Sequence, residues 1–301
     1  MFAPRSTPIP ARVTYRFEEF MPGETEERRR LRARPDFPWI ARQAAIHLAT
    51  AYRGNYLLTR VLNDRGRLTL ALLMLQMHFE PPEAPGLTAG RLKAEASALG
   101  ICSPGRVAAI VSAFRLLGLV TSAPDADRRR RRLIVTGRLL DIHRERWRVL
   151  LKALALVLPE GAAGLARLDD DAFLAAFVDA LLEPLRHGWR PVYDIPELEL
   201  FVDRDGGLMI AFGLFGTAPS GTPVTVAGLA RAYRVSRSHV VDIVQKATEA
   251  GLIRRYGPED QGRSGIVAEP ALIDAMERLI ATALVRQANA VRHALKAIGA
   301  G

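Results

Sequence analysis

Two stretches of the chain repeat the same pattern of residues, and this repeat limits the fold more than any other feature of the sequence. Like residues stand 133 positions apart in four places: Ser103 and Ser236, Gly118 and Gly251, Arg130 and Arg263, and Leu139-Leu140-Asp141 and Leu272-Ile273-Asp274. Upstream, the spacing rises to 137 between Thr88 and Thr225, as loops of different length would produce. Self-similarity at a fixed spacing indicates a repeated structural unit. The sequence therefore predicts two copies of one unit within 301 residues.

The second copy, from Thr225 to Arg263, predicts two short helices followed by a hairpin. Thr225 and Ser236 are residue types that cap helix N-termini well, and Gly251 stands where a helix-ending glycine is expected. Between Ser236 and Gly251, apolar residues recur at the spacing of one buried helix face: Val240, Ile243, Val244 and Ala247. The residues after Gly251 predict a strand and a turn that form a basic hairpin.

The first copy shows the same order of signals. Thr88 predicts the cap of one helix, and Ser103, followed by a proline, predicts the start of the next. The buried face of that second helix is expected at Val107, Ile110, Val111, Phe114 and Leu117. Gly118 ends it, and residues 119–121 and 133–135 predict the two strands of a hairpin with five arginines on its return.

The rest of the chain predicts a helical scaffold and two connecting segments. Apolar residues at helical spacing predict further helices over residues 39–51, 68–79, 142–158, 173–185, 208–215 and 272–298. Residues 1–37, rich in Pro, Arg and Glu, predict a mobile N-terminal arm, and residues 159–172 predict a linker. The expected domains are therefore 38–158 and 173–301. The fold class is mainly α with small β wings, in which two tandem units are joined by long helices.

The order of helix, turn, helix and hairpin resembles the winged helix-turn-helix. In that class the second helix enters the DNA major groove, and the hairpin, or wing, lies over the backbone or the minor groove. The alternative interpretation is a small helical subdomain whose polar face is only solvated.

A closer resemblance covers about residues 65–158. The run Asp125-Ala126-Asp127-Arg128-Arg129, followed by Leu133-Ile134-Val135-Thr136-Gly137-Arg138-Leu139-Leu140, is similar to the wing and the next helix start in the MarR family of bacterial regulators. The second copy lacks the Thr-Gly pair and has Ala268-Glu269-Pro270 there. MarR proteins bind DNA as homodimers of single-unit chains. The resemblance therefore implies a chain that imitates such a dimer within one polypeptide.

The charge of the chain favours a polyanionic partner, and double-stranded DNA first. Its 42 Lys and Arg against 32 Asp and Glu give a formal net charge of +10. Almost all of the basic residues are Arg, a bias that a GC-rich genome also produces. The single cysteine, Cys102, excludes an internal disulfide, and the six His show no metal-ligand spacing. Without a phosphate-binding loop, nucleophile motif or carboxylate pair, we expect no enzyme activity, no cofactor and no metal.

The candidate DNA contacts lie on the second helices, on the wings and near the first helices. They are Arg91, Ser103, Arg106, Arg128, Arg129, Arg130, Arg131, Arg132, Arg231, Arg234, Arg237, Ser238, His239, Gln245, Lys246 and Arg263. Arg106 is the expected base reader of the first unit, because an Arg–guanine pair discriminates by about 1–3 kcal/mol. Ala109 and Ser112 beside it are small, so the two units are expected to act unequally. Asp242 and Glu249 oppose phosphate, so their face must meet bases or a protein partner.

These observations predict a sequence-specific DNA-binding transcription regulator that uses two winged helices as a pseudo-dimer or dimer. As a pseudo-dimer, it would place its recognition helices about 34 Å apart, one DNA turn. One alternative is a plasmid-type replication initiator with tandem winged helices. A second is a winged-helix scaffold for protein–protein contacts, which would favour acidic wings. A homodimer through the C-terminal helix and a small-molecule effector of unknown identity remain open. No signal or membrane-spanning stretch is evident, so a cytoplasmic, nucleoid-associated location is expected.

Overall fold

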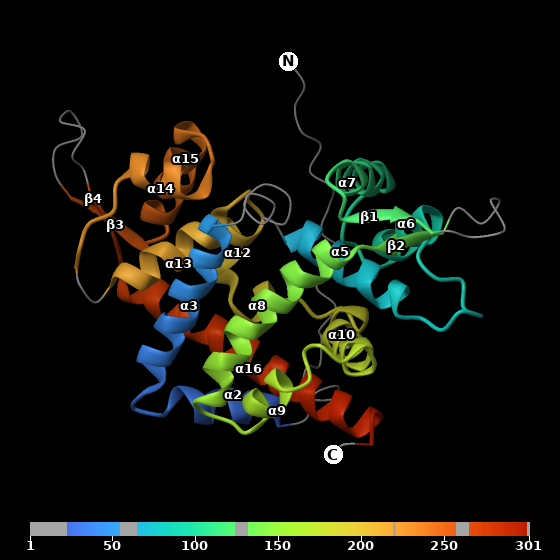
Figure 1. The fold of residues 1–301 in the computed structure, drawn as a ribbon. Coiled ribbons are helices and arrows are strands. Elements are labelled where there is room, and N and C mark those ends of the chain that lie inside the picture. The colour runs from blue at the N-terminus through green and yellow to red at the C-terminus, as the bar shows by residue number, and fades with distance from the viewer. Residues whose placement is uncertain (1–22, 55–64, 124–131, 219–220, 257–264, 300–301) are drawn as a thin grey trace.

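The computed structural model describes residues 23–54, 65–123, 132–218, 221–256 and 265–299, and the account below concerns these residues (Figure 1). They form a mainly helical structure with two small antiparallel sheets of two strands each. The expectation of a mainly α chain with small β hairpins is confirmed.

The elements of the first half run from an N-terminal helix to a pair of helices after the first hairpin. They are α2 (Glu24–Arg32), α3 (Phe37–Gly54), α5 (Arg65–His78), α6 (Ala89–Ala98), α7 (Pro104–Leu116), β1 (Val120–Ser122), β2 (Leu133–Val135), α8 (Gly137–Ala155) and α9 (Glu160–Leu165).

The second half repeats this order after a long helix and three short ones. Its elements are α10 (Asp171–Arg186), α11 (Pro191–Asp194), the 3-10 helix η1 (Pro196–Leu198), α12 (Glu199–Val202), α13 (Gly207–Thr217), α14 (Val226–Tyr233), α15 (Arg237–Glu249), β3 (Ile253–Tyr256), β4 (Gly265–Ala268) and α16 (Pro270–Ala297).

The 133-residue offset of the sequence holds in the backbone pairing of the two hairpins. Val120 pairs with Val135 in the first sheet, and Ile253 pairs with Ala268 in the second. Each sheet is extended by one isolated bridge to the segment before the first helix: Thr88, the cap of α6, pairs with Arg132, and Val224, two residues before α14, pairs with Ile266. The two copies therefore share strand register as well as element order.

The helix starts of the two copies are capped in the same way. The Ser103 hydroxyl accepts a hydrogen bond from the backbone N–H of Arg106 at 3.3 Å, and that of Ser236 accepts one from His239 at 3.2 Å. Thr88 and Thr225 cap α6 and α14 through the equivalent bonds. Such caps each contribute about 1 kcal/mol, which explains why local sequence locates these helices.

One side-chain hydrogen-bond link of the first hairpin has no equivalent among the described residues of the second copy. The hydroxyl of Thr136 donates to the backbone carbonyls of Gly118 at 2.7 Å and Leu119 at 3.1 Å. It thereby ties the end of β2 to the turn after α7. Glu269 stands at the equivalent position; its backbone N–H bonds to the Leu252 carbonyl at 2.9 Å, and its carboxylate accepts from Arg254 of β3 instead. Thr136, the first residue of the Thr-Gly pair, thus has a local structural role.

The long helices form a scaffold below the two hairpin-bearing lobes (Figure 1). α16 packs against α2, α3, α8, α9 and α10. The helices that precede each copy are exchanged: α3 packs on α13 of the second copy, and α10 packs on α5 of the first. The expected domains 38–158 and 173–301 therefore share one core, because each contributes a helix to the other.

The end of the expected N-terminal arm is a packed helix. Residues 1–22 lie outside the described residues, but α2 and the start of α3 are ordered against α16. The side chains of Glu24, Leu31 and Phe37 are buried there. The arm expected over residues 1–37 is corrected accordingly, because contacts with α16, distant in sequence, hold these residues.

The expected linker, residues 159–172, is also largely helical. It contains α9, and Asp170 caps the next helix by accepting bonds from the N–H groups of Ala172 and Phe173. A Cβ on Gly161 would lie 2.1 Å from the backbone nitrogen of Ala155, so only glycine allows this approach to the end of α8. Gly161, in the segment expected to be a linker, instead permits α9 to pack closely against the end of α8.

An aromatic cluster joins the two halves inside the scaffold. Trp147 of α8 meets Phe177 of α10 edge to face, with ring centroids 5.3 Å apart. His143, one turn before Trp147, is fully buried, and its centroid lies 5.4 Å from the Trp147 ring. Arg146 Nη1 lies 3.5 Å from the Nδ1 of His143, which can only accept from the guanidinium. Burial, and then the charge of Arg146, holds the pKa of His143 well below its ordinary 6.5.

The depressed pKa of His143 predicts a loss of stability in mild acid. Below pH 6.5 the unfolded chain binds a proton at this residue, whereas the folded chain does not until the pH is much lower. The free energy of unfolding is therefore expected to fall with decreasing pH, by up to about 1.4 kcal/mol per pH unit for this group. Denaturant unfolding across this pH range measures the slope. His143→Leu should flatten it, whereas the exposed His47→Leu should not.

Candidate nucleic-acid interface

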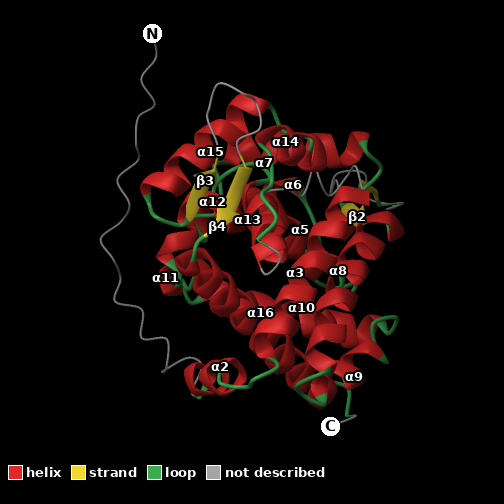
Figure 2. Cartoon of the chain, turned by 90° about the vertical axis from the view of Figure 1, so that its left-hand side faces the viewer, coloured by secondary structure: helices red, strands yellow, loops and turns green. Residues whose placement is uncertain are grey.

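The second helices of the two copies, α7 and α15, lie at the same end of the molecule. Figures 1 and 2 place both in the upper part, with α2 and α9 at the opposite end. The two hairpins lie on opposite sides of this end (Figure 1). The two second helices and the two hairpins therefore all lie toward one end of the molecule.

In α15, the expected apolar face is buried and a polar face is exposed. Val240, Ile243, Val244 and Ala247 are buried, as predicted. Of the predicted contacts, Arg237, Ser238, Gln245 and Lys246 are exposed. Val241 is 41% exposed between them, so this outward face also carries an apolar side chain that the sequence reasoning missed.

One edge of α15 is bonded to the turn between α12 and α13. His239 donates from Nε2 to the backbone carbonyl of Asp205 at 2.9 Å. Asp242 is paired with Arg204 of the same turn and with Lys246, whose Nζ lies 3.1 Å away. Hydrogen bonds from Arg204 and Lys246 hold the pKa of Asp242 below its ordinary value. Of the residues predicted as DNA contacts, His239 thus also bonds α15 to this turn, and Lys246 forms an ion pair within α15.

The exposed surface of α7 carries two charged residues, Arg106 at its start and Arg115 near its end. Its other exposed residues are Pro104, Gly105, Ala109, Ser112, Ala113 and Leu116. Leu116 is 88% exposed, the most exposed large apolar side chain of the described residues. Arg106 and the cap Ser103 are exposed at the start of the helix, as expected for contact residues. Arg115 is turned to the hairpin, where it bonds to the Ser122 hydroxyl at 3.0 Å.

Arg91 belongs to an ion-pair cluster beside the first hairpin. Its guanidinium is paired with Glu80, and its Nε lies 2.9 Å from Glu95 Oε1. The hydrogen bond from Arg91 holds the pKa of Glu80 below its ordinary value. A phosphate would have to displace two carboxylates, so the structure gives Arg91 a structural role and weakens its prediction as a DNA contact.

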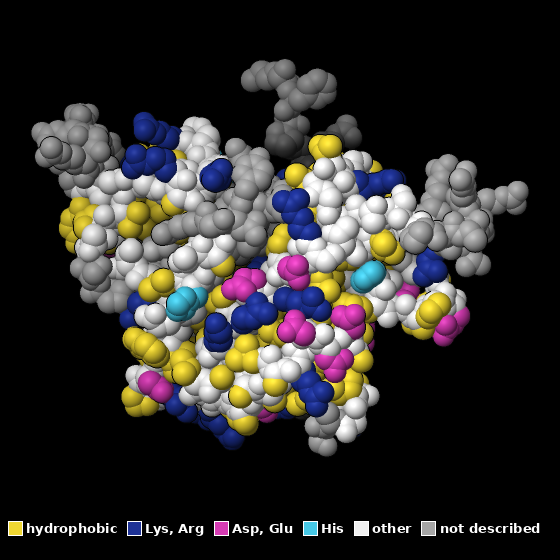
Figure 3. All heavy atoms as spheres, in the orientation of Figure 1, with side chains coloured by type: hydrophobic (Ala, Val, Ile, Leu, Met, Phe, Trp, Pro, Cys, Tyr) yellow, Lys and Arg dark blue, Asp and Glu magenta, His cyan; other side chains and the backbone are white. Residues whose placement is uncertain are grey.

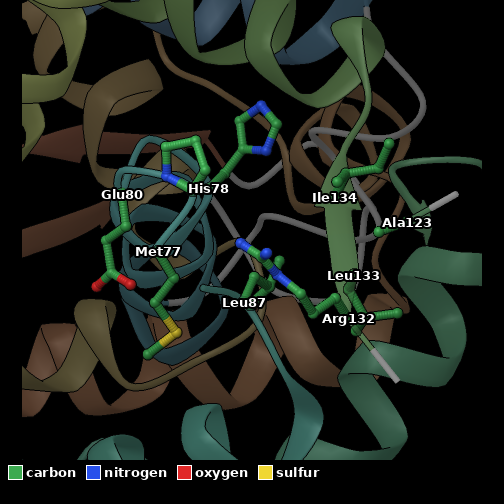
Figure 4. Close-up of a pocket in the computed structure, with 9 residues that line it drawn as sticks. Met77, His78, Glu80, Leu87, Ala123, Arg132, Leu133 and Ile134 are labelled. Atoms are coloured by element: carbon green, nitrogen blue, oxygen red, sulfur yellow. The ribbon is translucent and has the colours of Figure 1, made fainter. Parts of the chain in front are cut away.

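Arg132 extends into a small pocket between the hairpin and the end of α5 (Figure 4). The pocket has a volume of about 260 Å³ and is lined by Met77, His78, Glu80, Pro82, Leu87, Ala123, Arg132, Leu133 and Ile134. Pockets that bind small molecules usually have volumes of about 300 Å³ or more. The pocket therefore adds little to the expectation of an effector ligand.

Basic side chains gather over α14 and α15 (Figure 3). Arg231 and Arg234, predicted as phosphate contacts, are exposed in and just after α14. Arg254 is exposed on β3, where its guanidinium lies 4.3 Å from the Tyr256 ring and its Nε bonds to Glu269 at 2.7 Å. Four of the first wing's predicted contacts (Arg128, Arg129, Arg130 and Arg131) and Arg263 of the second lie outside the described residues.

Within the described ranges, no group of three or more His, Cys, Asp and Glu side chains could hold a metal ion. None of the described helices combines the length and the apolar character needed to cross a membrane. Comparison of the chain with family models, curated proteins and solved structures finds no match.

Proposed function

We propose that the chain is a sequence-specific, double-stranded DNA-binding transcription regulator built from two winged helix-turn-helix units that act as an internal pseudo-dimer. The observation that carries the proposal is the repeated unit itself. Two helices and a hairpin recur with the same caps and strand register, and both second helices lie at the same spatial end of the molecule. In the winged-helix class these second helices enter successive major grooves.

Charge supports DNA over a protein partner for this end. The net charge is +10, and Arg231, Arg234 and Arg237 are exposed on or beside α14 and α15. Asp242, one of the two carboxylates that opposed this interpretation in the sequence, is compensated by Arg204 and Lys246. A polyanion therefore meets less repulsion on α15 than the sequence alone indicates.

Titration of duplex binding against salt tests the proposal. Binding to a random duplex and to the promoter of the protein's own gene should weaken steeply with salt, with a slope of about −0.9 for each phosphate neutralised. Arg231→Ala is expected to reduce that slope by about one contact and to weaken all duplexes alike. Preference for tandem repeats over promoter sequence would favour a replication initiator.

A control variant comes from the opposite end of the molecule. Arg29 of α2 has a 72% exposed side chain, so Arg29→Ala removes the same charge far from α7 and α15. It should leave duplex binding unchanged. Absence of duplex binding at low salt, or equal loss in Arg29→Ala and Arg231→Ala, would contradict the proposed interface.

A further inference from the structure

At several equivalent outward positions, α7 carries small or apolar side chains, whereas α15 carries polar or charged ones. With the 133-residue offset, the outward residues of α7 correspond to a polar set in α15: Gly105 to Ser238, Ala109 to Asp242, Ser112 to Gln245, Ala113 to Lys246, and Leu116 to Glu249. Base edges in the major groove are distinguished mainly by hydrogen bonds. Of these five residues of α7, only Ser112 has a side chain that makes them; Arg106, at the start of the helix, corresponds to His239, and Arg115 is bonded to Ser122.

The polar residues of α15 divide into two groups by their contacts. His239 and Asp242 are bonded to the Arg204–Asp205 turn, which packs beside the helix. Arg237, Ser238, Val241 and Gln245 are exposed on the outward face. The bonds of Gln245 and Ser238 there are local ones within the helix and its cap: the Gln245 amide donates to Glu249 at 3.0 Å, and the Ser238 hydroxyl lies 3.1 Å from that of Ser236. An arginine suits guanine, a glutamine suits adenine, and an apolar side chain suits the thymine methyl group.

The turn also fixes the orientation of the helix. The bond from His239 lies in the first turn of α15, and the pairing of Arg204 with Asp242 lies about one turn farther along. Two attachments along one edge restrict rotation of the helix about its axis. The equivalent of Asp242 in α7 is Ala109, whose side chain cannot form an ion pair.

We propose that α15 carries the base-specific recognition of this protein and that the Arg204–Asp205 turn holds it in its reading orientation, so that the DNA target combines one strongly specified and one weakly specified half-site. This inference rests on the proposed function and names its partner more closely. Arg204 is a positioning residue, whereas Arg237 and Gln245 contact the bases.

Selection from a random-sequence duplex library, followed by affinity measurement on the selected duplex, tests the first part. The selected sites should show strong preference in one half only. Gln245→Ala should weaken binding to the selected duplex about 5- to 100-fold, while binding to random duplex changes little. Ser112→Ala, the matched change in α7, should alter neither affinity by more than about twofold.

The positioning role of Arg204 has its own test. Arg204→Ala should lower the ratio of selected to random duplex affinity without changing the thermal midpoint. Asp242→Asn alone should lower the ratio by a similar factor, and adding it to Arg204→Ala should lower the ratio no further, because both changes break the same ion pair. If Asp242→Asn leaves the ratio unchanged, or the two changes lower it additively, the positioning role is overturned.

The outcomes separate this inference from the proposed function. A palindromic site with equal preference in both halves, or equal losses in Ser112→Ala and Gln245→Ala, overturns the inference but keeps the DNA-binding function. Failure to bind random and selected duplex alike overturns both.

Discussion

The Phe177→Ala variant is expected to have a free energy of unfolding about 3–5 kcal/mol lower than that of the parent chain. Phe177 of α10 is fully buried, between Trp147 of α8 at 5.3 Å and Phe173 at 5.6 Å. Truncation removes both ring contacts and leaves a cavity that the long helices around it cannot fill. Chemical denaturation followed by tryptophan fluorescence measures the change.

The same experiment tests whether the two halves form one cooperative unit. α3 and α10 are exchanged between the halves, so their cores are continuous, and we expect a single transition that shifts as a whole. Trp39→Ala is the control, because Trp39 is 56% exposed and its loss should change the free energy of unfolding by less than about 0.5 kcal/mol. Two transitions, of which only one moves in Phe177→Ala, would show that the halves unfold separately.

The repeated units could be predicted from the sequence because their signals are local. A capping hydroxyl, an apolar stripe and a terminal glycine act within one helix. Ser103 and Ser236 cap the helices that they predicted, and Gly118 and Gly251 follow them with φ of 66° and 68°. The exchange of α3 and α10 could not be predicted in this way, because periodicity shows that a helix has a buried face but not which helix covers it.

The predictions that the structure corrects concern residues whose conformation or role depends on contacts with residues distant in sequence. The Arg- and Glu-rich segment before residue 37 is polar enough to suggest a mobile arm, yet Arg286 of α16 pairs with Glu24 and orders it. In the candidate site, Arg91 and Lys246 were predicted as DNA contacts because Arg and Lys are the residue types that bind phosphate. Only the structure shows that Glu80 and Asp242 bind them. The sequence did not indicate a role for Arg204, because that role depends on its contact with Asp242 of α15, which is distant in sequence.

The Glu24→Ala variant tests the docking of α2 directly. Glu24 is 2% exposed, and its Oε1 lies 2.6 Å from Arg28 Nη2 and 3.0 Å from Arg286 Nε. Both guanidiniums are largely buried, and that of Arg286 stacks on Trp189 at 4.4 Å. Alanine would leave Arg28 with its pair to Asp194 at 2.8 Å, but it would take from Arg286 the Glu24 carboxylate in a poorly solvated site. Breaking a buried pair from one side costs about 3–5 kcal/mol, and we expect a loss of that size in the free energy of unfolding.

Glu26, on the same helix, provides the matched control. It pairs only with Arg29 and Arg30, whose side chains are exposed, so Glu26→Ala should leave the denaturation midpoint nearly unchanged. Glu24→Gln should fall between the two, because the amide oxygen keeps a hydrogen bond to Arg28 but loses the charge that Arg286 requires. If Glu24→Ala and Glu26→Ala behave alike, the Glu24 carboxylate contributes nothing to holding α2 on α16, and the apolar contact of Leu31 and the pairs Glu27–Arg292 and Arg32–Asp274 hold the helix instead.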